Sequence, residues 1–298
     1  MSQLLRVLVV GAHPADVFDN CAGTIIHHTA RGDWVGGVIM THGARVHDKK
    51  VVDEMQHRDR VPEAAELSDL IAARAEVKAE EIRRIGRFLG MAEVRFMSAD
   101  DAVLLVTEDM VRRVARLLRK LQPDLLITHF PKEAGGIGSQ HATTGQIVMH
   151  AVELAAAPDP GDTHPPHTVI QVFFFGGLST DVRSTVWKAE GGFRNDVVVE
   201  ITDVIDKKLA CLEMLESQGY GGAYARKRIE VCDGAFGKSV YVAYAEGFIS
   251  LRSSVHHHLP VSGLDCKIHR MSDQQRRAYR SRQIGPHDGP SENGNLLP

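Results

Sequence analysis

The sequence predicts an α/β fold with a Rossmann-like, mostly parallel sheet flanked by helices, and three observations support this. The first apolar run, residues 4–10, is almost continuous, rich in β-branched residues and followed by Gly11, which is typical of a strand buried on both faces. Strand-like runs then alternate with amphipathic helical segments. The 298 residues are 43% hydrophobic and 24% charged, enough for a full core in an ordinary globular protein.

The predicted elements follow in a regular order. After the first strand we expect a helix over 20–31, a strand over 34–41 and a polar loop over 42–50. A helix over 62–89 ends at Gly90, and its predicted buried stripe is Leu67, Leu70, Ile71, Ala75, Ile82, Ile85 and Leu89. A strand over 93–97, a helix over 108–121 and a strand over 123–129 come next.

The second half is predicted to complete the same domain. A proline-rich connection over 157–167 leads to strands over 168–175 and 196–201 and a helix over 203–217. From about Gln274 the chain is rich in Arg and then in Gly, Pro, Ser and Asn, a composition that does not order itself alone. We therefore expect a catalytic domain over 1–252 and a C-terminal extension over 253–298 with a partly flexible tail, docked on a neighbouring subunit.

Composition narrows the class of function. A net charge of -3 gives no field to hold nucleic acid, and no apolar run approaches the roughly 20 residues that span a bilayer. The N-terminus lacks the pattern of a cleaved signal, and the four cysteines form neither a CxxC pair nor a disulfide framework. These features favour a small-molecule substrate, a cytoplasmic location and, from the Arg-rich C-terminal segment, a homo-oligomer.

Chemically capable side chains follow three predicted strands. Ligands of open α/β sheets bind beyond the carboxyl ends of the strands. Here those ends carry His13 with Asp16, His42 with Arg45, and His129 with the loop to His141. A His and an Asp three residues apart aim at one point, and nitrogen with oxygen suits Zn²⁺. On position alone, Asp16 as a helix cap and His141 as an ordinary first-turn residue stay open.

Several motifs together are similar to the LmbE-like (PIG-L) superfamily. They are the AHPxD frame at 12–16, the Gly23-Thr24 pair, and the strand ending in Thr128-His129 before a loop and a single His. The segments at Glu80-Glu81, Leu89-Gly90 and 244–248 also fit, so the resemblance covers about residues 4–250. It implies a Rossmann-like fold and a zinc ion held by His13, Asp16 and His141, with a fourth position open to water.

The sequence departs from the family's deacetylases at two places. Ala15 stands where they carry the Asp that acts as general base, and the HxDH pattern reads 138–141 GSQH. General-base assistance contributes roughly 10²–10⁴ in rate, so a deacetylase would need a base from elsewhere. The AHPAD variant resembles the branch of 4-oxalomesaconate hydratases, which add water to a double bond and protonate no departing amine.

The loop after the second strand is the predicted source of the missing groups. His47 or Asp48 is the candidate base, Arg45 the clamp for a substrate carboxylate with His42 beside it, and His129 a proton donor or a positioning residue. Taken singly, each loop residue is equally compatible with a solvated polar loop.

Three functions remain open on this sequence. The first is a zinc hydratase acting on a small unsaturated oxo-carboxylic acid, as in aromatic-compound catabolism. The second is a zinc N-deacetylase with a relocated base. The third is a non-catalytic relative that keeps the fold for binding.

Overall fold

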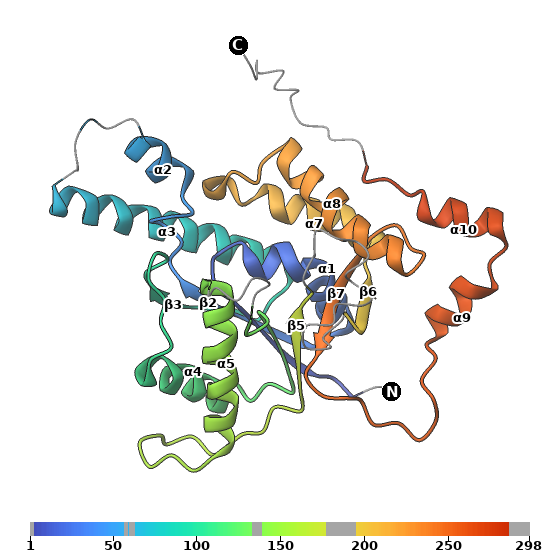
Figure 1. Cartoon of the computed structure of the whole chain (residues 1–298), viewed down its shortest axis with the longest axis horizontal. Helices are drawn as coiled ribbons and strands as arrows, with labels where there is room; N and C mark the ends of the chain where they lie inside the picture. The colour runs from blue at the N-terminus through green and yellow to red at the C-terminus, as the bar shows by residue number, and fades with distance from the viewer. Residues whose placement is uncertain (1–2, 57–58, 60–62, 133–138, 177–194, 286–298) are drawn as a thin grey trace.

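A seven-stranded sheet forms the centre of the protein (Figure 1), in a computed structural model that describes residues 3–56, 59, 63–132, 139–176 and 195–285. The strand order is β3-β2-β1-β4-β5-β7-β6. β1 (Arg6–Gly11), β2 (Trp34–Thr41), β3 (Glu93–Ala99), β4 (Leu125–Thr128) and β5 (Gln171–Phe175) run parallel. β7 (Ala245–Ser250) is antiparallel to both β5 and β6 (Val197–Glu200). The predicted α/β, mostly parallel architecture is confirmed.

Helices cover both faces of the sheet. α1 (Asp16–Arg31), α3 (Ala64–Leu89), α7 (Ile205–Glu213) and α8 (Ala223–Ser239) share one apolar core with the sheet. α4 (Glu108–Leu121) and α5 (Gln140–Ala156) share a second core on the other face. Because both faces are covered, the central strands are continuously apolar, and Val9, Val10 and Ile39 are fully buried.

Several predicted elements differ in their bounds. α1 starts at Asp16 rather than Asn20, and the expected polar loop after β2 contains the short α2 (Lys49–Gln56). The expected single helix over 203–217 is divided into η1 (Thr202–Val204), α7 and η2 (Glu216–Gln218). Gly90 ends α3 with a φ of 78°, as predicted.

The predicted buried stripe of α3 is right only for the C-terminal half of the helix. Ile82, Ile85 and Leu89 are buried, whereas Leu67, Leu70, Ile71 and Ala75 are only half-buried. The N-terminal half projects beyond the sheet beside α2 (Figure 1), so its apolar side chains have no sheet to pack on. Periodicity identified the face but not how far the core extends along it.

α1 is interrupted near its middle, and a buried acid satisfies the break. Cys21 has a non-helical φ of -150°. The carboxylate of Glu246 on β7 accepts hydrogen bonds from the backbone N–H groups of Gly23 and Thr24, at 2.9 and 2.7 Å. Lys208 of α7 lies 2.8 Å from this carboxylate and 2.8 Å from that of Asp233 on α8. One buried cluster therefore joins four elements behind the first turn of α1.

The chain after β7 packs back onto the same domain near its end. α9 (Gly263–Arg270) and α10 (Asp273–Arg280) follow a strap, residues 251–262, in which Val255 and Leu259 are 97% and 94% exposed. Ile284 is buried, and Arg226 donates to the carbonyl oxygens of Ile284 and Gly285. The segment expected to lack order from Gln274 on is thus helical to Arg280 and packed to Gly285. Within the described residues, no helix is long and apolar enough to cross a membrane.

Candidate metal centre

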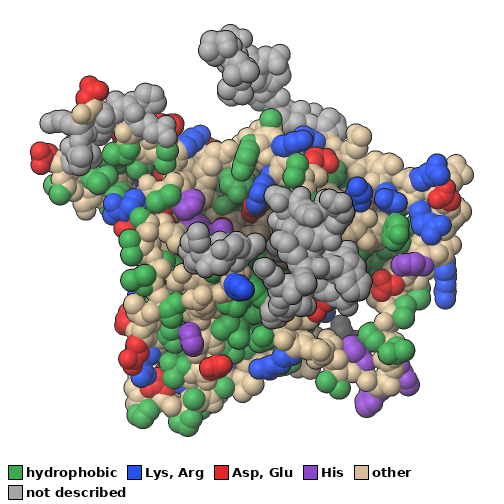
Figure 2. Space-filling view, in the orientation of Figure 1, with side chains coloured by type: hydrophobic (Ala, Val, Ile, Leu, Met, Phe, Trp, Pro, Cys, Tyr) green, Lys and Arg blue, Asp and Glu red, His purple; other side chains and the backbone are tan. Residues whose placement is uncertain are grey.

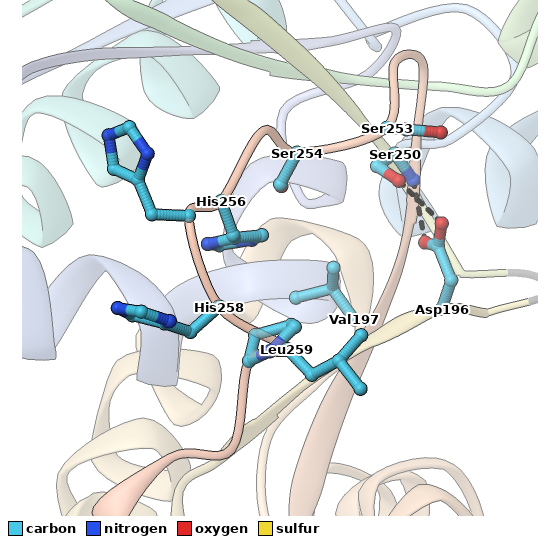
Figure 3. Close-up of a pocket in the computed structure, with 10 residues that line it drawn as sticks. Asp196, Val197, Ser250, Ser253, Ser254, His256, His258 and Leu259 are labelled. Atoms are coloured by element: carbon cyan, nitrogen blue, oxygen red, sulfur yellow. Dashed lines mark hydrogen bonds between the residues drawn. The ribbon is translucent and has the colours of Figure 1, made fainter.

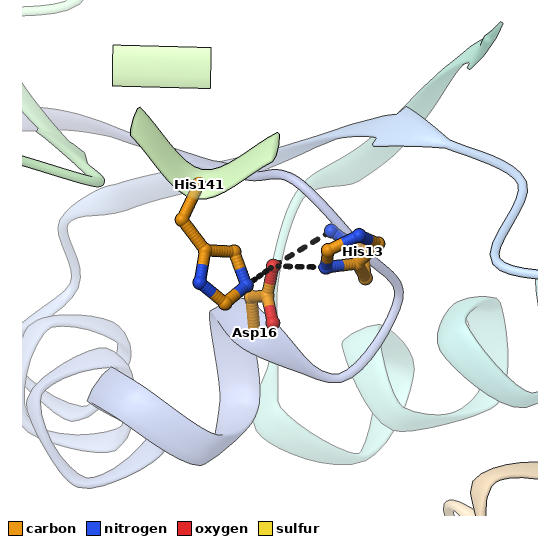
Figure 4. Close-up of side chains that lie close together, drawn as sticks. All are labelled: His13, Asp16 and His141. Carbon is orange, nitrogen blue, oxygen red and sulfur yellow. Dashed lines mark hydrogen bonds and ion pairs between the residues drawn. The ribbon is translucent and has the colours of Figure 1, made fainter. Parts of the chain in front are cut away.

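Three side chains converge at the carboxyl end of the sheet, as the motif spacing predicted (Figure 4). The potential ligand atoms of His13, Asp16 and His141 all lie within 4.8 Å of one another. Asp16 Oδ2 lies 3.3 Å from His13 Nδ1 and 3.5 Å from His141 Nε2. Two imidazoles and a carboxylate form a ligand set that suits Zn²⁺ and leaves room for further ligands. The residues present therefore fit a catalytic metal ion.

Local backbone geometry brings His13 and Asp16 together. His13 leaves the C-terminal end of β1, and Asp16 opens α1 three residues later. The backbone N–H of His13 donates to Asp16 Oδ2 at 2.7 Å, which closes the turn. α1 has Ala15 at its N-cap with no side-chain hydrogen bond, so Asp16 does not cap the helix; its carboxylate holds the turn and faces the two imidazoles.

His129 contacts two members of this group, His141 and Asp16. Its ring stacks on that of His141 with centroids 4.3 Å apart and an interplanar angle of 4°. Its Nε2 lies 3.1 Å from Asp16 Oδ2 and 3.1 Å from the backbone nitrogen of Ala12. One neighbour accepts and the other donates, so this nitrogen has a partner whether or not it carries a proton.

Charge is balanced inside the group. Burial alone would raise the pKa of Asp16, but hydrogen bonds from His129, His13 and His141 bring it well below the ordinary value. Burial lowers the pKa of His129, which outweighs its bond to Asp16. The carboxylate is therefore anionic and His129 is predominantly neutral at pH 7, the states in which a cation is best bound.

His47 lies against the ligand group and is held by Asp101. The rings of His47 and His13 have centroids 3.9 Å apart. His47 Nδ1 lies 3.2 Å from Asp101 Oδ2, and that carboxylate also accepts the backbone N–H groups of Arg45 and Val46, at 2.9 and 2.8 Å. Despite burial, these contacts lower the pKa of Asp101. An anionic carboxylate behind an imidazole orients the ring and fixes its tautomer.

The second candidate base, Asp48, has its oxygens occupied. It is fully buried, accepts the backbone N–H groups of Lys50 and Val51 at 3.1 Å, and pairs with Arg74 at 3.0 Å. It therefore caps α2 and anchors it to α3. Lys78, whose pKa burial lowers to about 8, donates to the carbonyl oxygen of His47 and stabilises the same loop.

The predicted substrate-binding residues occupy the same loop with partners of their own. Arg45 pairs with Asp100 at 2.8 Å, and its side chain is 41% exposed. His42 Nδ1 accepts the backbone N–H of Ala44 at 3.0 Å and lies 3.2 Å from Asp101 Oδ1. Although His42, Asp100 and Asp101 lie close together, these existing bonds account for their arrangement.

Three parts of the site were not predicted. Asp101 is the second residue after β3, so the strand-end rule applied to β3 would have found it. Gln140, noted only as a departure from the family pattern, contacts His13 Nε2. Asp19, one turn after Asp16, binds Arg228 at 2.6 Å and Tyr220 at 3.2 Å. No local motif signals that last group, because its members lie about 200 residues apart in the sequence.

A separate pocket lies beside the strap, away from the ligand group (Figure 3). It has a volume of about 570 Å³ and is lined by Asp196, Ser250 and the 256–258 histidines, among others. Histidine side chains gather there and near the middle of the face shown in Figure 2. The strap histidines are exposed, as predicted, and they are not part of the ligand group in the described chain.

Comparison with known proteins agrees with this geometry. Residues 8–152 match the PIG-L family, described as GlcNAc-PI de-N-acetylase. The chain is 26% identical over 178 residues to the 1D-myo-inositol 2-acetamido-2-deoxy-alpha-D-glucopyranoside deacetylase of Streptomyces griseus, covering 57% of this chain and 54% of that protein. It is 24% identical over 211 residues to the 4-oxalmesaconate hydratase of Pseudomonas putida, covering 71% of this chain and 73% of the relative.

Solved structures show the same fold in both kinds of enzyme. GalB, the 4-carboxy-2-hydroxymuconate hydratase of Pseudomonas putida, has a TM-score of 0.65 at 21% identity, covering 86% of this chain and all of that one. The N,N'-diacetylchitobiose deacetylase of Pyrococcus horikoshii has a TM-score of 0.64 at 20% identity, covering 82% and 83%. The resemblance predicted from the motifs is confirmed, because residues 8–152 match the PIG-L family and the fold is that of these solved structures.

Proposed function

We propose that this protein is a metal-dependent hydratase that adds water across an activated double bond of a small anionic oxo-carboxylic acid. One observation carries the proposal: Ala15, 4% exposed, offers no carboxylate at position 15, while the His47–Asp101 pair lies against His13. The longer match to the hydratase relative supports it.

The ligands in this proposal are His13, Asp16 and His141. Zinc bound there would polarise the substrate's oxo group and lower the pKa of water. The ligand set leaves a position for these oxygens, and the carboxylate offsets part of the ion's charge.

In the proposed reaction His47 takes a proton from water. Its Nδ1–H faces the carboxylate of Asp101, so Nε2 is the nitrogen left to accept. The water oxygen bonds to one carbon of the double bond, and the other carbon gains a proton. That proton is the one that His47 took from the water, so both hydrogens of the water molecule end in the product and His47 returns to its starting state. His129, predominantly neutral and hydrogen-bonded to Asp16, positions that carboxylate.

We further propose that Arg45 binds a substrate carboxylate. In the free protein its guanidinium is held by Asp100 at 2.8 Å, so the substrate would compete with that acid. Arg45→Ala should raise KM for the anionic substrate at least tenfold, because a hydrogen bond to a charged group contributes about 1.5–3 kcal/mol.

Arg83→Ala is the matched control for Arg45→Ala. Arg83 is equally exposed, 40%, and pairs with Glu76 at 2.7 Å on a helix outside the loop. The KM of the Arg83→Ala variant should stay at the wild-type value. An unchanged KM in Arg45→Ala would contradict the assignment.

The second candidate is an N-deacetylase in which the His47–Asp101 pair acts as the relocated base. The deacetylase relative and the shared fold favour it. Purified, zinc-loaded protein should be assayed for loss of enone absorbance with a 4-oxalomesaconate-type acid and for acetate release from N-acetylated amino sugars. Turnover of the acid alone supports the hydratase, and acetate release alone overturns it. If the protein catalyses neither reaction, the remaining function is that of a binding protein.

A further inference from the structure

We infer that Gln140 is a positioning residue that determines which nitrogen of His13 faces the metal. Gln140 is the first residue of α5 and directly precedes His141. Its Oε1 contacts His13 Nε2, and its Nε2 contacts the backbone carbonyl oxygen of Asp101. This inference rests on the proposed metal site but not on the reaction catalysed there.

The two contacts fix the orientation of the amide. A carbonyl oxygen carries no hydrogen, so Asp101 can only accept, and the NH₂ group of Gln140 must face it. The opposite atom, Oε1, then faces His13. A flip of the amide would place two acceptors against each other at Asp101.

The orientation of the amide in turn fixes the tautomer of His13. Oε1 can only accept, so Nε2 of His13 carries the hydrogen that it donates. When a metal ion replaces the hydrogen that Nδ1 otherwise donates to Asp16, the neutral ring keeps its single N–H at Nε2 and a lone pair at Nδ1. That nitrogen lies 3.3 Å from Asp16 Oδ2, on the side where the ligand atoms converge.

A contact of this kind has a measurable consequence for metal binding. Partners that hold the second nitrogen of a ligating histidine typically change metal affinity 10- to 100-fold. Gln140 orients the ring without adding a charge beside it, whereas a carboxylate there would add one. It also ties α5 to the turn after β3, which contains Asp101.

The test compares three variants of the full-length protein. Gln140→Met removes both contacts at similar volume, and Gln140→Glu keeps an acceptor for His13. Gln146→Met is the matched control, because Gln146 lies on the same helix, is exposed and donates to the carbonyl oxygen of Pro131 at 3.0 Å. Thermal unfolding of each variant shows whether it is folded.

Two readouts are needed. Zinc affinity of the metal-free protein is measured by competition with a chromophoric chelator. The tautomer of His13 in zinc-loaded protein is measured by long-range ¹H–¹⁵N NMR, assigned with His13→Asn. We expect the wild type to carry the proton on Nε2, Gln140→Met to bind zinc 10- to 100-fold more weakly, and Gln140→Glu to stay within tenfold of the wild type.

Other results would overturn the inference. A wild-type His13 with its proton on Nδ1 contradicts it, as does wild-type affinity in Gln140→Met or an equal loss in Gln146→Met. If the wild type binds no zinc, the metal site fails and this inference fails with it. Loss of hydratase activity with these results intact would overturn only the proposed reaction.

Discussion

Ala15 and His47 together determine what chemistry this site supports. A methyl group at position 15 neither accepts nor donates a proton, and it is 4% exposed in the core behind the ligand turn. In the proposed reaction the base is the imidazole of His47, in contact with His13 and backed by Asp101. The proposed base therefore comes from the loop after β2 rather than from the motif itself.

The first prediction concerns this pair. His47→Gln should lower kcat by roughly 10²–10⁴, the usual contribution of a general base. Asp101→Asn should also lower kcat, because an amide that donates to Nδ1 favours the tautomer with the proton on Nε2. Steady-state kinetics at saturating substrate provides the measurement.

The half-buried His28 is the control for these variants, since it pairs with Asp33 at 2.6 Å on the far end of α1. His28→Gln should retain wild-type kcat. Full activity in both His47→Gln and Asp101→Asn would show that the base lies elsewhere.

At the scale of elements, α4 and α5 are joined by a single buried arginine. Arg119 of α4 is 2% exposed and donates to the carbonyl oxygens of Ala155, Leu154 and Ala157, which end α5. It also binds Asp162 at 2.9 Å. These bonds satisfy carbonyls that have no partner within the helix.

We predict that Arg119→Ala lowers the free energy of unfolding by about 3–5 kcal/mol, because it removes the donor to three carbonyl groups and leaves the buried carboxylate of Asp162 with His164 as its remaining partner. Arg116→Ala, three residues earlier and bonded only to the exposed carbonyl of Gly161 among the described contacts, should change it by less than about 0.5 kcal/mol. Urea denaturation measures both. Equal effects of the two substitutions would refute the capping role.

The buried cluster behind α1 makes stability depend on pH. Burial raises the pKa of Asp233 to about 7, even though Lys208 lies 2.8 Å away; the carboxylates of Glu246 and Asp19 add to the rise. The unfolded value is near 3.8, so between pH 4 and 7 the folded protein holds more protons. The free energy of unfolding should therefore fall as pH rises through this range, by up to about 1.4 kcal/mol per unit.

Asp233→Asn should flatten that dependence, since the amide does not titrate. Asp273→Asn, at an exposed pair with Arg277, should leave it as in the wild type. Thermal unfolding between pH 4 and 7 compares them. A slope in Asp233→Asn as steep as in the wild type would assign the pH dependence to other groups.

For the whole molecule, the sequence predicted the features that depend on residues close together in the chain. Apolar runs located the parallel strands, and the AHPxD spacing placed His13 and Asp16 at one point. α2 was missed because Asp48 and its bonds to α3, not apolar periodicity, hold it in place. α8 was missed because its apolar and polar residues are poorly segregated around the helix.

Long-range contacts account for what the sequence did not reveal. Asp101 reaches His47 from β3, and Gln140 reaches His13 from α5, across separations of 54 and 127 residues. Neither pairing is visible in a local pattern. Nor could periodicity show that Arg45 and Asp48 already have partners in the folded chain.

The most direct test of the central claim is the metal content of purified, untagged protein by mass spectrometry. His141→Ala is compared with His164→Ala, whose imidazole is similarly exposed, 43% against 40%, and also lies beside a carboxylate. We predict about one zinc per chain in the wild type and in His164→Ala, and loss of zinc in His141→Ala. Full occupancy in His141→Ala, or no zinc in the wild type after reconstitution, would contradict the metal site proposed here.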